Sequence, residues 1–215
     1  MNYRLIIFDL DGTVLNTLED LYLSTDYALK QCGFPERTMD EVRQFVGNGI
    51  RKLIERAVPE QTPETQINQV HQVFTEYYEK HCADNTKPYD GIPEVLQKLR
   101  QSGMKTAVVS NKADYAVQIL CKDYFPGMFD AVAGEREGIR RKPAPDSVRA
   151  ILEILQIPEE QAIYIGDSDV DIETAKNAGM PCISVEWGFR DREFLLRHGA
   201  QKIISRPEEL LDLIQ

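Results

Sequence analysis

From residue 87 onward, short apolar runs alternate with segments of helical periodicity, and this alternation constrains the fold more than any other feature. Strands separated by helices of about ten to fifteen residues favour a parallel sheet with right-handed crossovers. An earlier apolar run, which begins at Ile6, supplies the first strand. We therefore predict an α/β fold with a doubly wound, Rossmann-like parallel sheet. The elements expected after residue 87 are helix 92–101, strand 104–110, helix 113–122, strand 130–134, helix 146–156, strand 162–166, helix 170–178 and strand 181–185.

Between the first strand and this alternation the pattern is helical. Thr17 can cap a helix that runs to about Gln31, and the Thr38-to-Glu41 spacing is typical of a capping box at the start of a second helix. Two further helices are expected, over 50–58 and 64–82, the second with apolar residues at helical spacing. We predict a small helical bundle inserted into the α/β domain. The expected boundaries are 1–15 and 84–215 for the α/β core domain, and 16–83 for the inserted domain.

The charge balance restricts the partners. A net charge of −10 and a pI near 4.9 argue against nucleic acid or an anionic membrane as the main partner. No apolar run at the N-terminus is long enough for a signal peptide or a membrane span, so we expect a cytoplasmic protein. The four cysteines are far apart, with no C-x-x-C pair and no histidine at zinc-site spacing, so we expect reduced structural thiols.

Two aspartates follow the first strand at a spacing that brings them together. In a strand Asp9 and Asp11 point the same way, because side chains alternate with period two. Two like charges in one small space are unfavourable unless a cation binds them or one carboxylate serves as an acid. An ordinary strand end with an Asp-Gly turn remains the alternative.

Polar residues also follow other predicted strands. Ser110 and Asn111 end one strand, and Asp167 and Asp171 follow another about one helical turn apart. Lys142 lies in a basic run that prolines hold rigid. A helix cap and a solvated basic turn are the alternatives for the first pair and for the lysine. Because ligands of such sheets bind beyond the carboxyl ends of the strands, these residues predict one site. Carboxylate ligands without histidine or cysteine favour Mg²⁺.

These motifs resemble those of the haloacid dehalogenase superfamily of phosphohydrolases, and the resemblance covers the whole chain. The inserted helices look like the small cap domain that the family places between its first and second motifs. The motifs that carry the resemblance are Asp9-Leu-Asp11-Gly-Thr13, Ser110-Asn111, Lys142-Pro143, and Gly166-Asp167 with Asp171.

The resemblance implies a covalent, Mg²⁺-dependent phosphatase mechanism. Asp9 would take the phosphoryl group as an aspartyl phosphate, while Asp11 would protonate the leaving alcohol and then activate water. Mg²⁺ would be held by Asp9, the main-chain carbonyl of Asp11, and Asp167, with Asp171 in or behind that shell. The groups implied to hold the phosphoryl oxygens are Ser110, the backbone of Asn111, and Lys142.

The cap suggests a substrate. Residues Gly47-Asn48-Gly49 resemble a segment of phosphoglycolate phosphatases, so we expect 2-phosphoglycolate to bind at Asn48 and at Arg51. A pyrophosphatase or a sugar-phosphate phosphatase of the same superfamily is the alternative. A phospho-receiver or other binding module is a second alternative, but its phosphorylated aspartate would lie on a later strand and no large insertion would follow. A small phosphorylated metabolite is the expected partner, and the chain is expected to be a monomer or homodimer.

Overall fold

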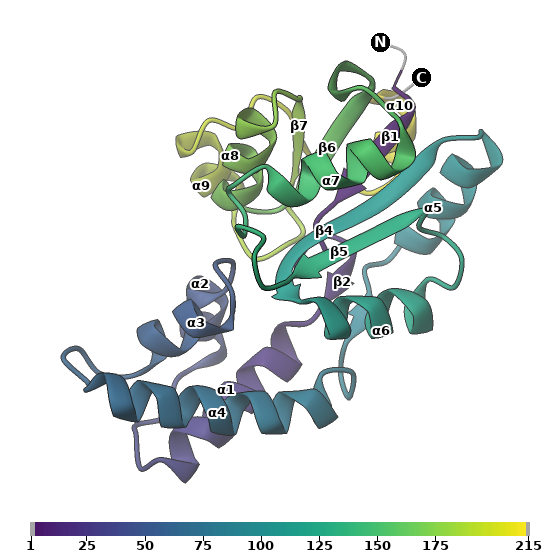
Figure 1. Cartoon of the computed structure of the whole chain (residues 1–215). Helices are drawn as coiled ribbons and strands as arrows, with labels where there is room; N and C mark the ends of the chain where they lie inside the picture. The colour runs from purple at the N-terminus through teal and green to yellow at the C-terminus, as the bar shows by residue number, and fades with distance from the viewer. Residues whose placement is uncertain (1–2, 214–215) are drawn as a thin grey trace. The chain divides into compact units, whose positions relative to one another are not determined.

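The computed structural model describes residues 3–213, which form two compact units (Figure 1). One unit contains the residues up to Leu15 and those from Pro88 onward, and the other contains residues 16–87. We call them the α/β unit and the helical unit.

The α/β unit is built on a six-stranded sheet with the order β5-β4-β1-β6-β7-β8, in which every recorded neighbouring pair is parallel. The predicted doubly wound sheet with an inserted helical bundle is confirmed. The strand β8 was not predicted, because two residues are too short to show a period. The strands are β1 (Leu5–Phe8), β4 (Lys105–Ala113), β5 (Ala131–Glu135), β6 (Ala162–Gly166), β7 (Cys182–Val185) and β8 (Ile203–Ile204).

Helices follow the strands much as the periodicity predicted. The helix expected at 92–101 is present with those bounds, and the other three predicted helices of this unit differ by one or two residues at their ends. A short 3₁₀ helix, Glu159–Gln161, precedes β6. The α-helices are α5 (Ile92–Gln101), α6 (Asp114–Tyr124), α7 (Asp146–Leu155), α8 (Asp169–Asn177), α9 (Arg192–Arg197) and α10 (Glu209–Leu213).

The central strand β1 is buried on both faces, which explains its unbroken apolar sequence. Its alternate residues enter two separate cores. Ile6 and Phe8 pack in the core that also contains residues of α5, α6 and α10, whereas Leu5 and Ile7 pack with residues of α7 and α8. The carboxyl end of β1 therefore lies in the middle of the sheet, with β4 on one side and β6 on the other.

The helical unit contains α1 (Leu18–Gln31), α2 (Met39–Phe45), α3 (Ile50–Ala57) and α4 (Glu64–His81), which share one apolar core. The predicted capping box is confirmed, because Thr38 and Glu41 exchange hydrogen bonds at the start of α2. Thr17 does occupy the cap position of α1, but its side chain makes no capping hydrogen bond. The amide of Leu18 instead donates to Oδ1 of Asn16, 3.3 Å away.

The chain passes between the units through two short strands, β2 (Leu15–Asn16) and β3 (Lys87–Pro88), which pair with each other. The expected second boundary, between residues 83 and 84, lies four residues before the one in the structure. The reason is Asp20 of α1, which is buried and accepts hydrogen bonds from Asn85 and Thr86. These bonds tie residues 85–86 to the helical unit.

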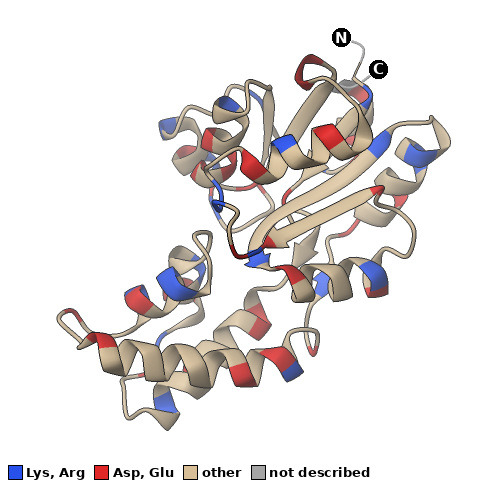
Figure 2. Cartoon of the chain, viewed as in Figure 1, with Lys and Arg blue, Asp and Glu red and all other residues tan. Residues whose placement is uncertain are grey.

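Most charged residues lie on helices and loops rather than along the strands of the sheet (Figure 2). All four cysteines are free thiols, as expected. Among residues 3–213, none of the helices is both long and apolar enough to cross a membrane.

Candidate active site

Asp9 follows the last residue of β1 and faces a buried ammonium group. Nζ of Lys142 lies 2.9 Å from Oδ1 of Asp9 and 2.8 Å from Oδ1 of Asp171. It also lies 3.1 Å from the hydroxyl of Tyr164 in β6, whose own proton is donated to the carbonyl of Val109. One lysine thus joins the strand end that carries Asp9 to the helix that carries Asp171, although these residues are far apart in sequence.

This lysine contacts two members of a cluster of three carboxylates. Oxygens of Asp9, Asp167 and Asp171 all lie within 4.8 Å of one another, and all three residues are buried. Burial, together with the charge of Asp171, raises the pKa of Asp9 to about 7 against the opposing charge of Lys142. Burial and the charges of Asp171 and Asp9 also raise the pKa of Asp167 well above its ordinary value. The protein alone therefore leaves this cluster short of positive charge.

A second lysine accompanies the other aspartate of the first motif. Nζ of Lys112 lies 2.9 Å from Oδ1 of Asp11, and its side chain is 2% exposed. Lys112 is not among the predicted site residues, although its position directly after Ser110 and Asn111 is a signal that could have identified it.

The donor set fits a divalent cation. Asp9, Asp167 and Asp171 supply three carboxylates, and one buried ammonium group, that of Lys142, contacts two of them, so the carboxylates outnumber it. A buried site with such an excess must take up protons or a cation. Its side-chain ligands are oxygens, which is the set that Mg²⁺ prefers. Asp9, Asp167 and Asp171 are therefore able to hold a metal ion, and the carbonyl of Asp11 stays a predicted ligand.

Asp171 has a structural task as well. Its Oδ2 accepts hydrogen bonds from the backbone amide of Ser168 at 3.1 Å and from the Ser168 hydroxyl at 2.6 Å, at the start of α8. Its Oδ1 accepts from Lys142. Both oxygens of Asp171 thus accept hydrogen bonds from the protein. The resemblance left two positions open for Asp171, in the metal shell or behind it, and these bonds favour the second.

A residue near the end of β4 binds the main chain of Lys142. Asn111 binds the main chain of Lys142 at two points: its Nδ2 donates to the carbonyl at 3.0 Å, and its Oδ1 accepts from the amide at 2.8 Å. The side chain of Asn111 therefore holds the main chain of Lys142, and a contact of the Asn111 backbone with the substrate stays a prediction. Ser110 is buried, and its Oγ accepts from the amide of Lys112 at 3.2 Å.

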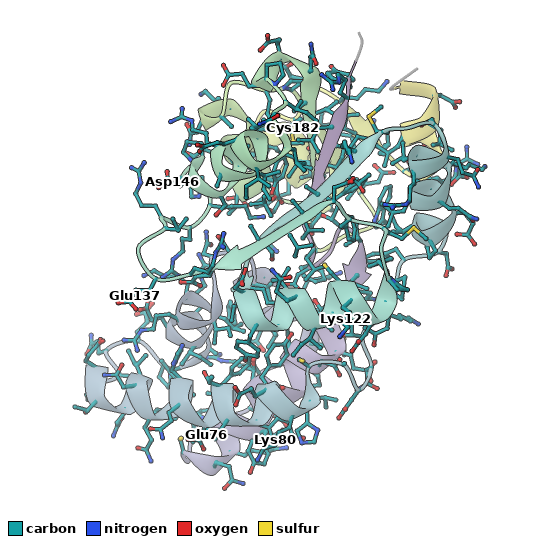
Figure 3. All side chains as sticks on the ribbon, turned by 45° about the vertical axis from the view of Figure 1, so that its right-hand side comes forward. Glu76, Lys80, Lys122, Glu137, Asp146 and Cys182 are labelled. Carbon is teal, nitrogen blue, oxygen red and sulfur yellow. The ribbon has the colours of Figure 1, made fainter. Side chains whose placement is uncertain are left out.

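The basic run at 140–142 contains both exposed residues and a buried residue of the site. Arg140 is exposed and pairs with Asp146, the residue that Figure 3 labels at the start of α7, and Arg141 pairs with Glu135. Lys142, the next residue, is only 4% exposed. The alternative of a solvated turn is therefore correct for the two arginines and wrong for the lysine.

A loop after β7 contacts the first motif, although none of its residues is among the predicted site residues. The indole of Trp187 donates to the carbonyl of Thr13 at 3.0 Å, and the amide of Phe189 donates to Oδ2 of Asp167 at 2.7 Å. Gly188 between them leaves no room for a side chain, since a Cβ there would lie 2.3 Å from the carbonyl oxygen of Gly12. No local pattern in the sequence marks this approach.

The two expected specificity residues lie in the helical unit. Arg51 donates hydrogen bonds to Glu55, Glu64 and Asn68, and Oδ1 of Asn48 accepts from Arg56 at 2.7 Å. The charge of Arg51 is thus met by carboxylates of its own unit. A role of these residues in substrate binding stays a prediction.

Known proteins resemble this chain along its whole length. The family model of haloacid dehalogenase-like hydrolases matches residues 6–185. A phosphoglycolate phosphatase of Aquifex aeolicus (strain VF5) is 34% identical over 98% of this chain and 96% of its own. An N-acetylmuramic acid 6-phosphate phosphatase of Pseudomonas aeruginosa is 30% identical over 100% of this chain and 96% of its own.

A solved structure shows the same architecture. A crystal structure from Lactobacillus delbrueckii subsp. bulgaricus, described as that of a candidate phosphoglycolate phosphatase, superposes with a TM-score of 0.96 at 41% identity. The match covers 100% of this chain and 99% of that one. Since the family model spans most of the chain and every residue of its acidic cluster, the chain belongs to the haloacid dehalogenase-like hydrolases.

Proposed function

We propose that this protein is a Mg²⁺-dependent phosphatase that hydrolyses a small phosphate monoester through a phosphoryl group carried on Asp9. The observation that carries the proposal is the buried cluster of Asp9, Asp167 and Asp171, of which Asp9 and Asp171 contact Lys142. A nucleophilic carboxylate, a fixed positive charge and a set of metal ligands are the groups that phosphoryl transfer to an aspartate requires.

The first step forms the covalent bond. A carboxylate oxygen of Asp9 attacks phosphorus, and the bond between phosphorus and the ester oxygen breaks. Lys142, Ser110 and the backbone of Asn111 hold the phosphoryl oxygens, on which negative charge must be balanced in the transition state. Bound Mg²⁺, held by Asp9, Asp167 and the Asp11 carbonyl with Asp171 behind, would supply further positive charge at these oxygens.

Asp11 moves the protons. It gives a proton to the departing alkoxide, so that the alcohol leaves neutral. It then takes a proton from the water that attacks the phosphoryl group on Asp9, and the products are inorganic phosphate and the regenerated carboxylate of Asp9. Asp11 ends each cycle with the proton that it gave away, so no further acid or base is needed.

We propose 2-phosphoglycolate as the substrate. The support is that a phosphoglycolate phosphatase covers nearly the whole chain at 34% identity, together with the Gly47-Asn48-Gly49 segment of the helical unit. A sugar phosphate is the second candidate, because the relative from Pseudomonas aeruginosa is an N-acetylmuramic acid 6-phosphate phosphatase at 30% identity.

A panel of phosphate esters ranked by kcat/KM tests both candidates. The panel contains 2-phosphoglycolate, N-acetylmuramic acid 6-phosphate, other sugar phosphates, pyrophosphate and p-nitrophenyl phosphate. We expect 2-phosphoglycolate to rank first, with activity that disappears in chelator and returns with Mg²⁺. If N-acetylmuramic acid 6-phosphate ranks first, the second candidate is correct. If the purified protein hydrolyses none of them with Mg²⁺, the proposed function is wrong.

The helical unit provides the test of specificity. We expect Asn48→Ala and Arg51→Ala to lower kcat/KM for 2-phosphoglycolate much more than for p-nitrophenyl phosphate, because only the former carries a carboxylate. Arg43→Ala is the matched control, since Arg43 makes an exposed pair with Asp40 on α2. Equal losses on both substrates, or none, would exclude this role for Asn48 and Arg51.

A further inference from the structure

The mechanism above leaves the buried ammonium group of Lys112 without a task. Its side chain is 2% exposed, and Nζ lies 2.9 Å from Oδ1 of Asp11, whose side chain is 15% exposed. The other buried lysine, Lys142, instead contacts Asp9 and Asp171. Each carboxylate of the first motif therefore has its own ammonium partner.

The backbone explains how Lys112 reaches the site. The register of β4 against β5 shifts between Val109 and Ala113, and such an irregularity can redirect the side chains within it. Ser110, Asn111 and Lys112 are consecutive and all buried. The amide of Lys112 also donates to the Ser110 hydroxyl, so both the main chain and the side chain of Lys112 are attached to groups of the site.

Fold stability alone does not account for this pair. Removing a lysine and an aspartate from water costs several kcal/mol per ion, and replacing a buried ion pair by apolar residues is often neutral or stabilising. A buried ion pair beside a group that must move protons has a second effect, which is to fix the orientation of the carboxyl group. An acid or base gains its efficiency from being held in the reactive geometry.

The contact also selects an oxygen. An ammonium group only donates, and Oδ1 of a carboxyl group accepts from it whether or not the other oxygen carries a proton. With Oδ1 bound to Lys112, the proton that Asp11 gives and takes is carried on Oδ2.

We propose that Lys112 is the positioning residue for Asp11, which holds Oδ1 so that Oδ2 serves first the leaving alcohol and then the water. The inference rests on the proposed function. It adds that Lys112 touches neither the phosphoryl group nor the rest of the substrate.

The test uses substrates that differ in their need for an acid. The alkoxides released from 2-phosphoglycolate and glycerol 1-phosphate must be protonated, whereas p-nitrophenolate leaves readily without a proton. Because kcat/KM reports the steps through the release of the alcohol, it isolates the first half of the reaction. We expect Lys112→Met to lower kcat/KM about tenfold or more for both alkyl esters and less than about threefold for the aryl ester. Lys112→Arg, which can still donate to Oδ1, is expected to recover part of the loss.

Two further variants complete the design. In an Asp11→Asn background, Lys112→Met is expected to change kcat/KM for the alkyl esters less than about threefold, because the group that it positions is already gone. This double variant also removes both charges of the buried pair, so it is expected to fold. Lys105→Met is the matched control: Lys105 lies on the same strand, pairs with Asp130 at 2.7 Å and is exposed, so its kinetics should equal the wild type. If Lys112→Met does not fold, Lys112→Gln replaces it.

Each other outcome overturns the inference. An equal loss on all three esters would show that Lys112 acts on the phosphoryl group, and a loss on 2-phosphoglycolate alone would show that it binds the substrate carboxylate. Effects that stay large in the Asp11→Asn background, or no effect at all, would show that it does not act through Asp11. Failure of the proposed function is a separate result, because the wild-type protein would then hydrolyse none of the three esters.

Discussion

The Nζ atom of Lys142 lies 2.9 Å from Oδ1 of Asp9, and both side chains are almost completely buried. The carboxylate proposed as the nucleophile is thus held by a fixed charge before any phosphate binds. Because Lys142 also bonds Asp171 and its backbone is bound by Asn111, its ammonium group has little freedom to move.

Replacing Lys142 by methionine should reduce both activity and stability. We expect kcat/KM to fall at least about tenfold to a hundredfold, since a charge-assisted hydrogen bond contributes about 1.5–3 kcal/mol. The free energy of unfolding should fall by about 3 kcal/mol, because two buried carboxylates lose their partner. Phosphatase kinetics and urea unfolding measure the two effects. Arg140→Met, in the exposed part of the same basic run, should change neither.

Replacing Asp9 by asparagine should abolish turnover, because an amide oxygen cannot form the phosphoenzyme. Acid quenching during turnover should trap a phosphorylated protein in the wild type and none in Asp9→Asn. Asp11→Asn should still become phosphorylated, but with a rate lowered by about 10²–10⁴-fold for an alkyl ester, the usual contribution of acid–base catalysis. Near-normal turnover by Asp9→Asn would exclude the covalent mechanism.

The metal-free protein should become less stable as the pH rises from about 4 to about 7. The pKa of Asp9 is raised from 3.8 in the unfolded chain to about 7 in the folded protein, so the folded state holds a proton that the unfolded state has lost. This contribution is complete below pH 4 and is lost as the pH passes 7, at up to about 1.4 kcal/mol per pH unit. The raised pKa of Asp167 acts in the same direction.

Urea unfolding over this pH range, in chelator and in Mg²⁺, tests the effect. Mg²⁺ should stabilise the protein more at pH 8 than at pH 5, because it competes with protons for the same carboxylates. Asp9→Asn should flatten the slope in chelator. A stability that stays constant between pH 4 and pH 8 in chelator would contradict the expectation.

Replacing Gly12 by alanine should weaken metal binding. The φ angle of Gly12 is +83°, and a Cβ there would lie 2.3 Å from Oδ2 of Asp167, so the carboxylate must move. Gly103 is a matched control, because its φ is +81° and a Cβ there would meet nothing within 4 Å. Gly103→Ala should lose about 1–2 kcal/mol of stability through the backbone strain, and Gly12→Ala should lose at least as much.

Only Gly12→Ala should also lower the affinity for Mg²⁺, measured by calorimetric titration. An unchanged affinity in Gly12→Ala would show that Asp167 does not hold the metal in the proposed way.

Much of this fold is visible in the local pattern. The alternation after residue 87 predicts a parallel sheet, because a helix between two strands returns the chain to the end of the sheet where the previous strand began. The position of Asp9 after β1, of Ser110 within β4 and of Asp167 after β6 then predicts that they meet, since parallel strands end at the same edge. The spacing between Thr38 and Glu41 likewise predicts their capping box, whose bonds span only three residues.

Tertiary structure alone decided which side chains touch within the site. Lys112 is 101 residues from its partner Asp11 in the sequence. The part of β4 that contains Lys112 is irregular in its register against β5, so a regular period in the sequence does not predict the contact. The approach of Gly188 to Gly12 has no local signature, because what excludes a side chain at Gly188 is a carbonyl oxygen distant in the chain. Periodicity records whether a residue faces the core or the solvent, whereas the pairing of two buried charges depends on the distance between elements, which only the packed structure determines.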